Sequence, residues 1–194
     1  MTVPSLIQNH RRKIYVTQLH KVYTEFSQAL VQYQTDRNAV NLTEAGLVSQ
    51  NNFNSLVADY FKIVQKCDSS LTPCFSENYK TLNGGSVSFS NATSYVLSSG
   101  SSIRFLVSKQ VDKIGQVGVD INGKQGPNIL GRDLFFIAVY KDGTLDDFNG
   151  GTGTAPLTEE LRNNVYNSDC QGSGLVSGWG CFGKILNDNW EMTY

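Results

Sequence analysis

Residues 4–33, PSLIQNHRRKIYVTQLHKVYTEFSQALVQY, carry the longest regular pattern in the chain. Apolar residues recur there at spacings of three and four, which places them along one face of a single long α-helix, while polar residues take the other faces. An apolar face of this length needs a partner surface. The rest of the chain contains strand-like segments, so we expect the helix to lie across a β-sheet. The residues of the apolar face are Ile14, Leu19, Val22, Tyr23, Phe26, Ala29, Leu30 and Tyr33.

The remainder of the chain predicts a second helix followed by short strands. A helical period runs from Phe53 to Lys66, with Asn51 and Asn52 as its expected cap. The run at residues 134–140 is almost continuously apolar, which is typical of a strand covered on both faces. Further strands are expected near 87–89, 95–97, 103–107, 117–121, just before Phe148 and, as an edge strand, at 190–194, with short helices near 157–166 and 182–186.

Composition indicates one globular domain of the α+β class. The chain has 194 residues, of which 40% are hydrophobic and 11% aromatic, so it is long enough to bury a sizeable core. We expect the long helix in residues 1–35, a helix and loop region in 36–83, and the sheet with C-terminal loops in 84–194. The net charge of −1 argues against a nucleic-acid partner, since such domains carry a basic excess. The basic run at residues 10–13 is typical of a solvated helix turn.

Four cysteines form two sequence-local pairs, Cys67 with Cys74 and Cys170 with Cys181. Four cysteines allow three connectivities, and we favour the local pairs because each spans a stretch rich in turn-forming residues. Metal-binding thiols are the alternative, but neither pair has C-x-x-C spacing and both histidines lie far away in the sequence. Disulfides would indicate an oxidising compartment. No run of 18 apolar residues is present, so the sequence as given predicts no membrane span.

The segment from residue 120 to 133, DINGKQGPNILGRD, combines carboxylates, carboxamides and glycines. Such a loop could wrap oxygen ligands around Ca²⁺, which takes 6–8 oxygen atoms from side chains and backbone carbonyls. The candidate ligands are Asp120, Asn122, Asn128 and Asp133. Turn chemistry is the commoner explanation, because Asn-Gly and Gly-Pro favour tight turns and Asp or Asn side chains accept local backbone hydrogen bonds. No other cofactor is indicated.

Catalytic constellations are hard to assemble from this sequence. It lacks a G-x-S-x-G elbow, a phosphate-binding loop and an H-E-x-x-H motif. Its two histidines, His10 and His20, both fall on the expected long helix, where nothing would exclude water from a Ser/His/Asp or Cys/His arrangement. We therefore expect a protein that is not an enzyme.

Three stretches of the chain resemble type IV pilin-like proteins, a class that includes the pseudopilins of type II secretion systems. They are residues 1–7, the loop and strand of residues 120–135, and the C-terminal set Cys181, Ile185, Trp190 and Tyr194. The middle stretch is the most specific, and together they span most of the chain. The sequence departs from the class at its start, where the prepilin peptidase site and an apolar assembly segment of roughly 20 residues are absent. On this interpretation the chain is the soluble part of such a subunit, and residues 1–35 are the C-terminal half of its long helix.

The resemblance implies a pilin-like fold and a non-enzymatic structural subunit, a pilin, minor pilin or pseudopilin of a bacterial type IV pilus or type II secretion-like filament. It implies other subunits as partners through the N-terminal helix. It also implies a precursor that is methylated at its N-terminus after cleavage and anchored in the inner membrane by the missing segment, then a place in the periplasm or at the cell surface. The alternative is an extracellular adhesin or ligand-binding module that uses the same fold.

Overall fold

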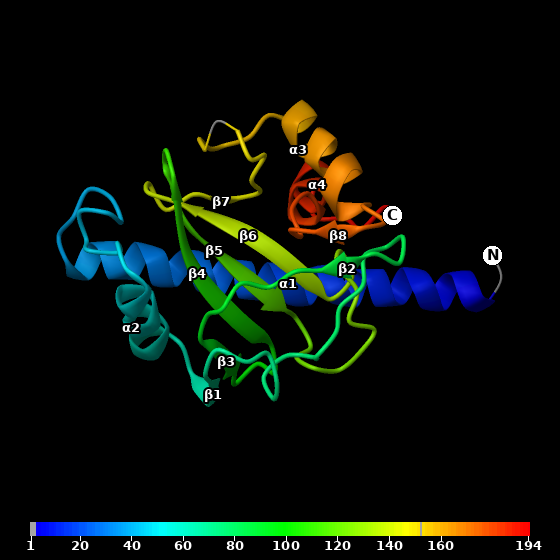
Figure 1. The fold of residues 1–194 in the computed structure, drawn as a ribbon, viewed down its shortest axis with the longest axis horizontal. Helices are drawn as coiled ribbons and strands as arrows, with labels where there is room; N and C mark the ends of the chain where they lie inside the picture. The colour runs from blue at the N-terminus through cyan, green and yellow to red at the C-terminus, as the bar shows by residue number, and fades with distance from the viewer. Residues whose placement is uncertain (1–2, 152) are drawn as a thin grey trace.

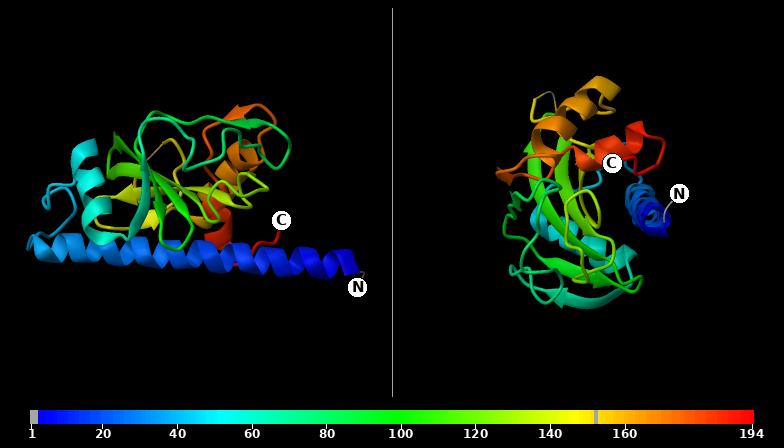
Figure 2. Two further views of the ribbon diagram at one scale, coloured as in Figure 1. Left: turned by 90° about the horizontal axis from the view of Figure 1, so that it is seen from below. Right: turned by 90° about the vertical axis from the view of Figure 1, so that its right-hand side faces the viewer.

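The computed structural model describes residues 3–151 and 153–194, with side chains described from Ile7 onward. Helix α1 (Val3–Asp36) runs along the whole length of the molecule, and its N-terminal end projects beyond the remaining elements (Figures 1 and 2). The predicted long helix is therefore confirmed. The apolar opening at residues 1–7, one of the three stretches of resemblance, lies outside the described side chains except for Ile7.

The buried face of α1 begins at Val16 and ends at Tyr33. Seven residues on it are at most 8% exposed, and they are Val16, Leu19, Val22, Phe26, Ala29, Leu30 and Tyr33. The prediction was wrong at Ile14, which is 42% exposed, and incomplete at Val16. The helical period continues through Ile14, but burial of the apolar face begins only at Val16.

The main sheet has six strands in the order β1-β3-β4-β5-β6-β7, and every neighbouring pair is antiparallel. The central strands β4, β5 and β6 are the longest, and they follow one another in the chain as an antiparallel meander. A parallel pair of two-residue strands, β2 with β8, lies outside this sheet. The strand bounds are β1 Ile63–Cys67, β2 Ser86–Val87, β3 Ser94–Leu97, β4 Ser102–Gln110, β5 Lys113–Asp120, β6 Leu134–Tyr140, β7 Leu145–Asp146 and β8 Leu175–Val176.

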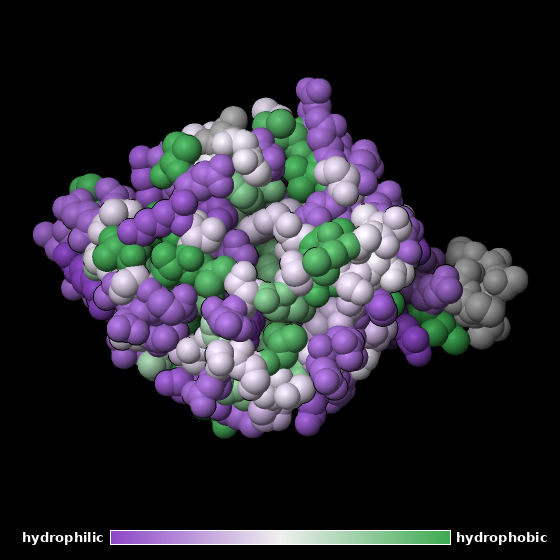
Figure 3. Space-filling view, in the orientation of Figure 1, coloured by the Kyte–Doolittle hydropathy of each residue, from purple (hydrophilic) through white to green (hydrophobic). Residues whose placement is uncertain are grey.

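Both faces of the sheet are covered, as the apolar run at 134–140 predicted. On the inner face, Phe105 of β4 stacks on Phe26 of α1 with 5.7 Å between ring centroids, and Ile137 shares this face through the register across β5. On the outer face, Phe136 packs against Phe89 and Trp179, which belong to connecting segments. Every residue of β6 is buried. Over these segments the outward surface mixes apolar and polar side chains (Figure 3).

The second helix differs from its prediction at both ends. Helix α2 spans Gln50–Tyr60, and its N-cap is Ser49, whose hydroxyl oxygen accepts a hydrogen bond from the Asn52 amide. The residues after Tyr60 turn into strand β1, which pairs with β3, so the region 36–83 contains a strand as well as a helix and loops. The sequence has a helical period at residues 63–66, but these residues form a strand because they pair with β3, which lies about thirty residues further along the chain.

The C-terminal region consists of short helices on the β7 side of the sheet (Figure 1). They are α3 (Glu159–Val165), a π-helical turn (Tyr166–Cys170) and α4 (Cys181–Asn187). The predicted edge strand at 190–194 was wrong. Trp190 lies instead with its ring against His20 and Tyr23 of α1, at centroid distances of 4.3 and 5.0 Å. Packing against the helix thus takes the place of pairing with a strand.

Two disulfides close the loops that the sequence predicted they would close. Cys67 is bonded to Cys74, and Cys170 to Cys181. The first joins the end of β1 to the loop that follows it, and the second joins the π-helical turn to the first residue of α4. The α+β class, the short second helix and both local pairings are therefore confirmed.

Candidate functional site

The N-terminal part of α1 is exposed along its length from Ile7 onward. None of the side chains from Ile7 to Tyr15 is buried, and Ile7 and Ile14 are 50% and 42% exposed. The basic run at residues 10–13 lies in the same part of the helix. This part of the helix therefore presents apolar and positively charged side chains to solvent. We call residues 7–15 the projecting segment.

Two other parts of the chain lie beside the projecting segment. Gly126 and Pro127, from the loop between β5 and β6, line a shallow pocket of about 500 Å³ together with Ile14 and its neighbours on the helix. On another side, Trp190 and Met192 border a groove of about 650 Å³ against residues 9–17 of α1. The projecting segment, the β5–β6 loop and the C-terminal residues therefore form one end of the molecule.

Arg132 links the β5–β6 loop to the C-terminal residues. Its guanidinium donates a hydrogen bond to the backbone oxygen of Tyr194 and lies 5.4 Å from the centre of that ring. Burial lowers the pKa of Arg132, and the nearby guanidinium of Arg12 lowers it further. The two guanidinium groups therefore repel each other across the projecting segment and the loop.

The four residues predicted as calcium ligands lie in the β5–β6 loop and at its two ends. Asp120 and Asp133 are completely buried. One oxygen of Asp120 accepts hydrogen bonds from the Tyr79 hydroxyl, and the other accepts one from the Asn122 amide at 3.2 Å. The Asp133 carboxylate accepts from the amides of Asn128 and Ile129, both at 2.7 Å. The structure therefore brings both carboxylates into the base of one hairpin loop.

Turn chemistry accounts for part of this loop, as the sequence indicated. The Asp120–Asn122 contact is a local side-chain-to-backbone bond, and Gly123 has φ +68°. Turn chemistry leaves two atoms unexplained. The side-chain oxygens of Asn122 and Asn128 are buried and have no hydrogen-bond partner among the described residues.

Burial dominates the electrostatics of the two carboxylates. It raises the pKa of Asp120 to about 8, and the nearby Asp133 carboxyl acts in the same direction while the Tyr79 hydroxyl acts against it. Burial also raises the pKa of Asp133, and its hydrogen bonds from the Ile129 and Asn128 amides oppose the shift. The loop therefore holds two acidic groups in a place unfavourable to their negative charge.

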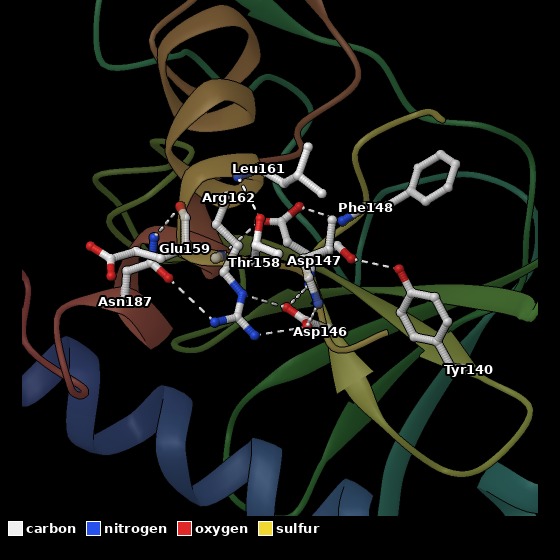
Figure 4. A network of polar contacts seen from close by, with 11 residues as sticks. Tyr140, Asp146, Asp147, Phe148, Thr158, Glu159, Leu161, Arg162 and Asn187 are labelled. Atoms are coloured by element: carbon white, nitrogen blue, oxygen red, sulfur yellow. Dashed lines mark hydrogen bonds and ion pairs between the residues drawn. The ribbon is translucent and has the colours of Figure 1, made fainter. Parts of the chain in front are cut away.

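A second buried acidic cluster was not predicted from the sequence (Figure 4). Asp146 forms an ion pair with Arg162 of α3 at 2.8 Å. Asp147 accepts hydrogen bonds from the amides of Phe148, Gly180 and Gly183, and burial raises its pKa to about 6. All of these contacts are to the protein itself and join β7 to the C-terminal helices. We interpret this cluster as structural.

Cysteine, histidine and acidic side chains do not form a transition-metal site in the described parts of the chain. There, no three or more of them are gathered closely enough to hold a metal ion. A metal site in these residues would have to combine carboxylate, carboxamide and backbone oxygens, the set that hard cations prefer.

Within residues 3–151 and 153–194, no helix has the length and apolar character needed to cross a membrane. Comparisons of the chain with known protein families, with curated proteins and with solved structures find no match.

Proposed function

We propose that this chain is a non-enzymatic structural subunit of a bacterial filament of the type IV pilus or type II secretion class, that is, a pilin, minor pilin or pseudopilin. The observation that carries the proposal is the division of α1 into two parts. From Val16 to Tyr33 its apolar face is covered by the rest of the fold, whereas in the projecting segment Ile7 and Ile14 are 50% and 42% exposed. The sequence resemblance to pilin-like proteins supports the same assignment.

The projecting segment is suited to contact other copies of the chain. Apolar surface gains about 25 cal/mol for each Å² removed from water, so Ile7 and Ile14 favour a partner surface. A continuous helix presents them in fixed positions, which lowers the entropy cost of association. In the proposed filament, the projecting segments of neighbouring subunits pack together at the centre. The outer face of the sheet and its loops then face outward.

The proposal includes a place outside the cytoplasm. Two disulfides support it, because such bonds persist in the periplasm and at cell surfaces. As in type IV pilins, an apolar segment ahead of α1 would anchor the subunit in the inner membrane until assembly. The basic run at residues 10–13 would then lie close to the anionic lipid head groups.

Site-directed crosslinking in the producing cells tests the proposal. Ile14→Cys should give disulfide-linked or bismaleimide-linked oligomers in the sheared surface or membrane fraction, because it lies in the projecting segment. Val64→Cys is the matched control, since Val64 is 66% exposed but belongs to the edge strand β1. Oligomers formed through Ile14→Cys and absent from Val64→Cys support assembly through the helix.

The coding sequence upstream of residue 1 gives a second readout. A prepilin peptidase site followed by about 20 apolar residues would support the filament subunit. A conventional signal peptide, together with monomeric secreted protein and no crosslinking through Ile14→Cys, would overturn it in favour of an extracellular adhesin or ligand-binding module.

A further inference from the structure

We infer that the outer face of the main sheet binds one monatomic anion, chloride in ordinary salt solutions, between Arg104 of β4 and Gln116 of β5. Arg104 is a buried cation without an acidic partner among the described residues, one of its N–H groups is unused, and a small cavity borders it. These three observations are independent of the proposed filament function.

The register of the sheet places Arg104 and Gln116 on its outer face. Arg104 lies opposite Gly118, which in turn lies opposite Phe136, the residue that packs outward against Phe89. Gln116 comes two residues before Gly118 in the same strand, so its side chain belongs to the same face. The segment that carries Phe89 covers this part of the sheet. As a result, Arg104 is only 5% exposed.

The positive charge of Arg104 has no acidic partner within the described residues. None of the ion pairs there includes it, and its hydrogen-bond partners are all neutral. Burial lowers its pKa, and no carboxylate in the described chain opposes this shift. A guanidinium nevertheless stays protonated in proteins. Burying a charge is costly unless it is paired, so an anion beside Arg104 would remove a large part of this cost.

One N–H group of Arg104 remains without an acceptor in the part of the chain that the structure describes. A guanidinium has five N–H hydrogens. Nε donates to the Ser90 carbonyl at 3.1 Å, and Nη2 donates to the carbonyls of Ser69 and Ser90, both at 2.8 Å. Nη1 donates once, to the Ser94 hydroxyl at 2.6 Å. These four bonds fix the guanidinium plane and leave one hydrogen of Nη1 for a further acceptor.

A small cavity borders Arg104 and offers a place for that acceptor. Its volume is about 10 Å³, which is close to the space of a single water molecule, and a halide ion is only slightly larger. Ser90 and Gln116 contribute to its polar lining, and Phe89 and Phe136 to its apolar lining. A cation would be repelled by Arg104, and a carboxylate or phosphate group is too large. A monatomic anion is therefore the charged ligand that fits.

Gln116 supplies a second donor for the ion. Its carboxamide borders the cavity from the neighbouring strand, so its NH2 group can donate to the ion from the side opposite Arg104. Gln116 and the adjacent Leu106 are half-buried, which allows the cavity to widen slightly toward solvent and lets the ion enter. A water molecule would also fit, but it would leave the charge of Arg104 uncompensated.

Thermal melting in two salts tests the anion site. The wild-type protein is melted in sodium chloride and in sodium gluconate, each at about 200 mM, because the gluconate ion is too large for the cavity. We expect the melting temperature to be higher by about 3 °C or more in chloride, since a ligand that binds only the folded chain stabilises it. Crystals grown in sodium bromide should show one anomalous peak beside the Arg104 guanidinium.

Two variants and a control assign the effect to Arg104. Gln116→Glu places a carboxylate beside the guanidinium in place of the ion. It should melt at a higher temperature than the wild type in gluconate and lose the response to chloride. Arg104→Met removes the cation and should also lose the response. Arg37→Met is the matched control, because Arg37 is exposed and follows the end of α1, and it should respond to chloride as the wild type does.

The inference is overturned if the wild-type protein melts at the same temperature in both salts, which would show that the cavity holds water only. It is also overturned if Gln116→Glu responds to chloride as strongly as the wild type, or if the bromide peak is absent. Because Gln116→Glu is expected to gain stability, the test does not depend on whether Arg104→Met folds.

Discussion

Gly131 lies directly against Cys181, so that a Cβ atom at residue 131 would be only 3.0 Å from the Cys181 sulfur. Through this contact the β5–β6 loop is fitted against the Cys170–Cys181 disulfide. Gly131 also has φ +81°, a conformation that other residues rarely adopt. Two separate constraints therefore require glycine at this position.

Replacing Gly131 should be more damaging than replacing a glycine that has only the backbone constraint. Gly131→Ala is expected to lower the free energy of unfolding by about 2–4 kcal/mol, the sum of strain at positive φ and overpacking against the disulfide. Gly143→Ala is the matched control, since Gly143 has φ +88° but open space around its Cβ position. It should cost about 1–2 kcal/mol. Urea denaturation measures both, and equal losses would contradict the packing argument.

Phe136 anchors the outer face of the sheet. Its side chain is 6% exposed and packs between Phe89 and Trp179. Phe136→Ala should destabilise the protein by about 3–5 kcal/mol, because a buried aromatic ring is lost and a cavity remains. The exposed Val64→Ala serves as the control and should change stability by less than about 1 kcal/mol. A loss below about 1 kcal/mol for Phe136→Ala would show that the outer face is not packed as described.

Lys113 should make stability depend on pH in the alkaline range. Its side chain is 1% exposed, its ammonium donates to the Ser108 carbonyl at 2.9 Å, and burial lowers its pKa from 10.5 to about 8. Between pH 8 and 10.5 the unfolded chain binds more protons at this lysine than the folded chain does. Stability from this group therefore rises with pH across that window.

The variant Lys113→Met removes this dependence while keeping a side chain of similar length. It should be more stable than the wild type at pH 7 by on the order of 2–3 kcal/mol, and the difference should shrink as the pH approaches 10.5. The measurement is the difference between the two urea midpoints at a series of pH values, in which the titration of tyrosines cancels. Parallel curves would contradict the assignment of a depressed pKa to Lys113.

The Asp146–Arg162 pair should be far more important for stability than a comparable exposed pair. Arg162→Ala leaves Asp146, which is 1% exposed, as a buried charge without its partner. The expected loss is about 3–5 kcal/mol. Lys141→Ala breaks an ion pair with Asp112 of similar length, 2.6 Å, whose side chains are 50% and 35% exposed, and should cost less than about 1 kcal/mol. Similar losses for the two variants would contradict the role of burial.

The sequence predicted the elements in which the spacing of apolar residues records which faces are buried. The stripe from Leu19 to Tyr33 was visible because this part of α1 has one continuously buried face, and the run at 134–140 because β6 is covered on both faces. The strand β1 was missed because Ile63 and its neighbours continue the helical period of α2. Their pairing with β3 is a long-range interaction that no local pattern records.

The sequence predicted which residue types make up the candidate sites, but it could not predict which of those residues contact one another. The Asn-Gly and Gly-Pro pairs indicated the turns between Asp120 and Asp133, but burial of the Asn122 and Asn128 oxygens depends on segments outside the loop. Arg162 reaches Asp146 across sixteen residues of chain, so their partnership leaves no local signal. Trp190 was assigned to a strand from its composition, although its position is decided by the rings of His20 and Tyr23.

The two-part helix determines how this domain would respond to a pulling force. At a rise of 1.5 Å per residue, the 34 residues of α1 extend over about 50 Å, and roughly half of that length is fastened to the rest of the fold. A pull on the free end acts parallel to the fastened half. It therefore loads the contacts from Val16 to Tyr33 in shear, all at the same time, and does not peel them apart one after another. Extraction of the helix would require the whole inner layer of the core to yield in a single step.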